Sequence, residues 1–134
     1  MKEGCEKMKC FAPLALRIGL GVIFAYHGYG KVFGAPGLGT GWNPQGMPEI
    51  VQALVAWGEL VSGIAILLGF LTEVAALGII IIMLGAIVMV HGKNGFNMMN
   101  MGYEYNFALI LMSVSLILSG PGCFALKSKC CPKK

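Results

Sequence analysis

The chain has 134 residues, of which 57% are hydrophobic and only 12% are charged, and its mean hydropathy is +0.76. Soluble domains carry about 25% charged residues, so this composition excludes an ordinary soluble domain and indicates a small integral membrane protein. The formal net charge of +4 is modest and the basic residues gather near the two ends, so we expect no nucleic-acid binding. We treat residues 1–134 as a single membrane domain.

Four apolar segments follow one another along the chain, at residues 11–33, 48–71, 72–91 and 103–124. Each holds about 20 residues, enough for a helix that crosses roughly 30 Å of hydrocarbon. The predicted fold class is therefore all-α, a transmembrane four-helix bundle of two antiparallel hairpins. The first segment is longer than the apolar part of a signal peptide, so we expect it to be retained as an anchor.

The connections between these segments differ greatly in length. Residues 34–48 form the longest loop, and a long loop is more often functional than idle. Between the second and third segments, Gly69 can end one helix and Thr72 can cap the next, so these helices must form a tight antiparallel hairpin. Small residues in these two helices permit close packing of their backbones, namely Gly63, Gly69, Gly78 and Gly85.

Lysine and arginine gather on the side that carries both termini, while the opposite side carries only Lys31 and Lys93. The positive-inside rule then predicts that both termini are cytoplasmic. All five cysteines would face that reducing compartment, so we expect no structural disulfide among Cys5, Cys10, Cys123, Cys130 and Cys131.

The most informative residue is Glu59, a lone carboxylate near the middle of the second apolar segment. A charge at that depth costs at least a few kcal/mol in lipid, so such a residue usually faces the protein interior and has a partner. The candidate partners are Arg17, His27, Lys31, His91 and Lys93.

Helical spacing places Arg17 and Lys31 on one stripe of the first helix, together with Gly21, Phe24 and Gly28. His27 lies beside this stripe. We expect the polar residues to converge in the outer half of the bundle, within aromatic walls that include Trp42 and Trp57. The candidate ligand-binding residues are Glu59, His27, Lys31, Arg17, Glu104, Tyr103 and His91, and no catalytic residue is assigned.

Structural roles remain open for several of these residues. Arg17 can extend to the cytoplasmic interface, and Lys31 can sit at the outer one. His27 can be a satisfied histidine of the bundle, and Glu104 can favour a helix N-terminus. The outer loop also carries donors that suit Cu(I), but methionine is a common apolar filler, so no metal is assigned to His91, Met98, Met99 and Met101.

Four stretches of the sequence together resemble the DoxX family. They are RIGLGVIFAYHGYGKVFG (17–34), WGELVSGIAILLGFLTEVAAL (57–77), GFNMMNMGYEYNFALIL (95–111) and GPGCFAL (120–126). The resemblance implies a four-helix membrane protein. The family takes its name from genes linked to terminal quinol oxidases, and its relatives include the membrane subunit of thiosulfate:quinone oxidoreductase. We accordingly expect multi-pass insertion in a prokaryotic plasma membrane.

Two readings of function follow. The first is a redox-associated subunit with an outer-half site for a quinone or another amphipathic ligand, where His27 and Glu59 hydrogen-bond the ligand and pass protons. The sequence carries no haem-ligand pair and no nucleotide motif, so we expect no covalent cofactor. The electrons would then come from a redox partner, either a membrane protein or a peripheral one. The second reading is a non-catalytic accessory or assembly subunit. A small proton-coupled transporter is a third, less favoured function. We also expect contact with membrane lipid, and the chain can form a homo-oligomer.

Overall fold

The computed structural model describes the backbone of residues 2–43 and 46–126, and the side chains of these ranges from residue 11 onward. Within them the fold is all-helical, as predicted. The four helices are α1 (Lys2–Phe33), α2 (Glu49–Leu68), α3 (Thr72–Ala86) and α4 (Glu104–Ser119). A π-helical turn, η1 (Ile87–His91), prolongs α3, and two 3-10 turns, η2 (Gly92–Asn94) and η3 (Met98–Asn100), lead into α4.

Three of the described helical segments are long and apolar enough to cross a membrane, at Phe11–Phe33, Glu49–Leu68 and Thr72–Asn94. The expectation of a fourth helix that reaches residue 124 is wrong, because α4 stops at Ser119 after 16 residues. Gly120 there has a φ of +74° and Pro121 follows, so the helix cannot continue. The expected first span, residues 11–33, coincides with the membrane-spanning part of α1, but the helix itself begins earlier, at Lys2, in a stretch rich in good helix formers.

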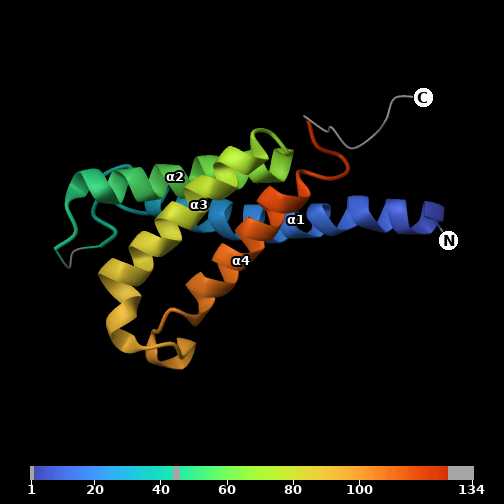
Figure 1. Ribbon diagram of the computed structural model, residues 1–134. Coiled ribbons are helices and arrows are strands. Elements are labelled where there is room, and N and C mark those ends of the chain that lie inside the picture. The colour runs from blue at the N-terminus through green and yellow to red at the C-terminus, as the bar shows by residue number, and fades with distance from the viewer. Residues whose placement is uncertain (1, 44–45, 127–134) are drawn as a thin grey trace.

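The helices form two antiparallel hairpins, α1–α2 and α3–α4 (Figure 1). We call the end with the α2–α3 turn and the loop after α4 the terminal end, and the opposite end the loop end. In Figure 1, α3 and α4 lean away from α1 as they approach the loop end. The main apolar core lies within the four helices and includes Leu20, Phe24, Ile66, Ile79 and Leu116.

Glycine allows α1 and α2 to approach each other closely. A Cβ atom on Gly63 would overlap the backbone of Ala25, and one on Gly21 would overlap the side chain of Leu67. The expected role of small residues is therefore confirmed for Gly63. Gly85 differs, because no atom lies within 4 Å of the place where its Cβ would be.

The turn between α2 and α3 is as short as predicted. Gly69 adopts a left-handed conformation with a φ of +68°, and its N–H reaches the carbonyl groups of Ala65 and Ile66. Thr72 does not cap α3, contrary to expectation: among the described residues its buried hydroxyl group has no hydrogen-bond partner. Leu71 precedes the helix instead, with a φ of +45°.

Candidate functional site

Glu59 is paired with Lys31. The ammonium nitrogen of Lys31, in the last turn of α1, lies 2.7 Å from each carboxylate oxygen of Glu59 in α2. The Lys31 side chain is 24% exposed and that of Glu59 only 4%. Of the candidate partners deduced from the sequence, the structure therefore selects Lys31, whose charge and hydrogen bonds compensate the buried carboxylate.

The long loop between α1 and α2 covers this ion pair. The Lys31 ammonium lies 4.7 Å from the centre of the Trp42 ring, a cation–π contact. The indole N–H of Trp42 donates to the carbonyl groups of Gly39 and Gln52. The buried amide side chain of Gln52 accepts from two N–H groups of the loop and donates to two of its carbonyl groups. Gln52 thus fixes the loop that holds Trp42 over Lys31.

A cavity of about 340 Å³ lies on one side of the ion pair, among α1, α4 and the end of α3. We call it the polar cavity, because hydrogen-bonding side chains from these regions and from α2 line it. They are His27, Lys31, Glu59, His91, Tyr105 and Asn106. Asn106 is buried, and its amide N–H points at the sulfur of Met83, 3.4 Å away.

His91 has a defined proton arrangement in this cavity wall. Its Nδ1 atom lies 2.8 Å from the carbonyl oxygen of Met101, which can only accept a hydrogen bond. Nδ1 therefore carries the hydrogen in the neutral ring, and Nε2 is the nitrogen left to accept one.

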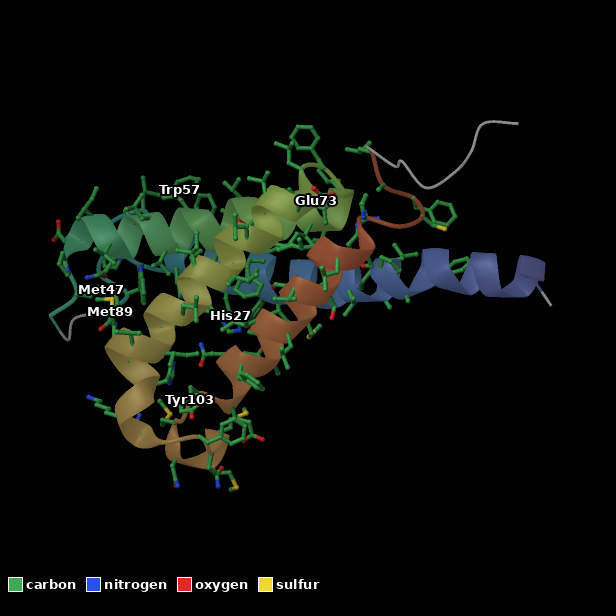
Figure 2. The ribbon with its side chains drawn as sticks, viewed as in Figure 1. His27, Met47, Trp57, Glu73, Met89 and Tyr103 are labelled. Carbon is green, nitrogen blue, oxygen red and sulfur yellow. The ribbon has the colours of Figure 1, made fainter. Side chains whose placement is uncertain are left out.

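A second cavity of about 380 Å³ lies between α2 and the α3–η1 segment, beneath the 34–48 loop. We call it the apolar cavity, because aliphatic and methionine side chains make up most of its wall. Figure 2 shows two of them, Met47 from the loop and Met89 from η1, near each other at the loop end. Lys31, Glu59 and His91 line both cavities, so the ion pair stands between them.

Arg17 does not join this site. It is 1% exposed and lies at the terminal end of the bundle. Its guanidinium group donates to the Ile66 and Leu67 carbonyl groups at the end of α2, at 2.9 and 2.8 Å. It also donates to the Pro121 and Cys123 carbonyl groups after α4, at 3.1 and 2.9 Å. Arg17 thus ties the end of α2 to the loop after α4, and its side chain is buried there rather than exposed.

Cys123 corrects the expectation that the cysteines form no disulfide, because it is disulfide-bonded. The expectation rested on the compartment alone, whereas the structure holds the Cys123 backbone in a fixed position through the hydrogen bond from Arg17 to its carbonyl group. The expectation for Cys5, Cys10, Cys130 and Cys131 concerns side chains outside the described part of the chain.

Of the seven candidate residues, His27, Lys31, Glu59 and His91 line the polar cavity, and Figure 2 shows His27 between α1 and α4. Tyr103 and Glu104 line neither cavity. The Tyr103 ring packs edge-on against Phe96, 5.4 Å between centres, and the Glu104 carboxylate accepts a hydrogen bond from the Met98 N–H. Both residues organise the loop before α4.

Gln52 and Asn106 were not predicted as site residues, and Trp57 does not line the site as expected. Both amides lie in apolar helices, where a polar side chain is expensive, and that signal could have identified them. Trp57 is exposed on the outside of α2, where its indole N–H donates to the Leu38 carbonyl group.

Comparison with known proteins identifies a family and two curated relatives. The DoxX family model matches residues 12–92. A Bacillus subtilis (strain 168) protein named "Putative oxidoreductase CatD" is 32% identical over 114 residues, which cover 84% of this chain and 82% of that protein. The "Inner membrane protein YqjF" of Escherichia coli (strain K12) is 26% identical over 121 residues, which cover 90% and 93%. No solved structure matches the chain.

Proposed function

The chain belongs to the DoxX family of membrane proteins, and from this premise we propose that it is a redox-associated subunit that binds a quinone-like amphipathic ligand in the polar cavity. The observation that carries the proposal is the Lys31–Glu59 pair in the wall of that cavity. Burying two charges inside a membrane bundle costs desolvation free energy even when they are paired, and ionisable groups at such depths are functional candidates by default.

The groups around the polar cavity match the chemistry of a quinone ring. The ring is apolar, and its two carbonyl oxygens need hydrogen-bond donors. Glu59 occupies two of the three donors of the Lys31 ammonium, which leaves one for a ligand. The amide of Asn106, from α4, offers a second polar contact in the cavity wall. A volume of about 340 Å³ lies at the small end of the range for small-molecule sites, which suits a single ring.

A quinone supplies two-electron, two-proton chemistry when it is bound. His27 is placed to move the protons, because it lines the polar cavity and also a surface hollow of about 580 Å³ beside α1. Its imidazole ring has two nitrogen atoms, so it can accept a hydrogen bond on one side and donate one on the other. Glu59 positions Lys31, so the ammonium donor stays at the cavity wall.

The electrons for this chemistry come from a partner protein, which is either a membrane protein or a peripheral one. The name of the Bacillus subtilis relative supports a redox role, and that of the Escherichia coli relative supports the inner membrane as the location. We propose a prokaryotic plasma membrane with both termini in the cytoplasm, so that the polar cavity lies in the outer half of the bilayer.

The test is to purify the protein gently from its native membrane, extract it with organic solvent and identify the bound small molecules. We expect up to one quinone molecule per molecule of wild-type protein. The Glu59→Gln variant, which lacks the charge partner of Lys31, should contain little quinone. The matched control is Glu49→Gln, at the exposed start of α2. Absence of any quinone from the wild-type protein, together with no binding of added quinone, would refute the proposal.

A further inference from the structure

The apolar cavity indicates that the ligand has an apolar tail, a property that the polar cavity alone does not require. We infer that the apolar cavity receives the hydrocarbon tail of the ligand, which enters from the membrane between α2 and α3. This inference rests on the proposed function and deepens it: the ligand is a long-tailed membrane quinone rather than a small water-soluble ring compound.

The position of the apolar cavity supports this assignment. It shares Lys31 and Glu59 with the polar cavity, so the two cavities adjoin at the ion pair, where the ring of the ligand is proposed to sit. The part of its wall contributed by α2 and by the α3–η1 segment consists mostly of Val, Leu, Ile and Met side chains, which offer a tail contacts without unpaired polar groups.

The cavity also opens toward lipid. Three apolar residues of its wall are largely exposed on the outside of the bundle: Leu54 by 66%, Ile81 by 63% and Met89 by 54%. Leu54 and Ile81 lie within the segments that can span the membrane. A side chain that lines a cavity and is also exposed at membrane depth marks an opening through which a lipid-dissolved molecule can pass.

The charge at the inner end of the cavity selects the class of amphiphile. Lys31 and Glu59 neutralise each other, with both carboxylate oxygens 2.7 Å from the ammonium nitrogen. A net neutral pair does not attract the phosphate of an anionic lipid strongly, but it still offers a donor to a carbonyl oxygen. A neutral ring with carbonyl groups and an apolar tail therefore fits the two cavities better than a phospholipid.

Gly85 provides a way to block the proposed tail path. It lines the apolar cavity but not the polar one, and a Cβ atom there would meet no atom within 4 Å. Gly85→Phe should therefore fill the cavity without displacing the backbone. The matched control is Val88→Phe, at an 84% exposed position one turn further along that lines neither cavity.

The experiment compares binding of two probes to the purified protein in lipid nanodiscs, a dimethoxy-methyl-benzoquinone without a tail and the same ring with a decyl tail. Burial of two methylene groups already corresponds to about tenfold in affinity. We expect wild-type protein to bind the decyl probe at least about tenfold more tightly. Gly85→Phe should remove this advantage and leave affinity for the tail-less probe within about twofold. Val88→Phe should change neither affinity. If Gly85→Phe does not fold, Ile81→Trp at the cavity mouth should produce the same selective loss.

Other outcomes separate the two proposals. Equal wild-type affinity for both probes, or equal losses in Gly85→Phe and Val88→Phe, would overturn the tail assignment and leave the ring site standing. Failure of the wild-type protein to bind either probe would overturn the proposed function and this inference with it.

Discussion

Gly28 of α1 lies directly against the backbone of Leu60 in α2. Gly28 is three residues before Lys31, and Leu60 directly follows Glu59. A Cβ atom on Gly28 would overlap the N and Cα atoms of Leu60. This contact brings the two helix backbones together at the level of the ion pair, so the reach of Lys31 to Glu59 depends on glycine at position 28.

Gly28→Ala should therefore destabilise the bundle, although alanine favours a helix more than glycine does. We expect a loss of about 1–3 kcal/mol in the free energy of unfolding, typical of overpacking. Gly30→Ala is the control, because nothing lies within 4 Å of the Cβ position there. Thermal unfolding in detergent micelles measures both. Equal stability of the two variants would contradict the close contact.

Breaking the ion pair from one side should cost more than removing it completely. Glu59→Leu leaves the Lys31 ammonium partly buried and unpaired, and losses of about 3–5 kcal/mol are typical of such changes. Adding Lys31→Met should recover much of that stability. A chemical denaturation series on the two single variants and the double variant gives the coupling energy. Additive losses would mean that the pair is not formed.

Arg17→Lys should destabilise the terminal end but spare the ligand site. Lysine keeps the charge yet cannot donate in the fork that reaches carbonyl groups of both α2 and the C-terminal loop. Each lost charged hydrogen bond is worth about 1.5–3 kcal/mol. We expect a lower melting temperature with unchanged affinity of the folded protein for a quinone probe. A change in affinity at equal folded fraction would place Arg17 in the ligand site after all.

The proposed orientation can be tested at Met99, which is 92% exposed in the loop before α4. In intact cells, a membrane-impermeant maleimide should label a Met99→Cys variant well above the background of the wild-type protein, which has its own cysteines. Labelling only after cell disruption would place the loop end in the cytoplasm and reverse the orientation.

Much of the architecture follows from local features of the sequence. Apolar runs predict the helices, and the glycine at position 69 predicts the tight turn between α2 and α3, where it adopts the left-handed conformation. The spacing that puts Arg17, Gly28 and Lys31 on one stripe of α1 also predicts the face that meets α2. Glu59 could be identified as a site residue because a carboxylate in an apolar helix requires a partner.

The choice of that partner could not be predicted, because it depends on how far α1 slides along α2. Glycine contacts set that register, and they are visible only once the helices are packed. The role of Arg17 was missed for a related reason: its partners are backbone carbonyl groups, which every residue has. The path of the loop over Lys31 was likewise hidden, because Gln52 directs it through four hydrogen bonds to the loop backbone.

Photolabelling tests the central claim, a quinone site at the Lys31–Glu59 pair, most directly. A tail-less azido-benzoquinone is activated on the purified protein and the labelled residues are identified by mass spectrometry. We predict labels on side chains of the polar cavity such as Met98, Met101 and Tyr105, and their loss when unlabelled quinone is added in excess. Labels that resist competition, or that fall on lipid-facing residues of α4 such as Leu118, would contradict the claim.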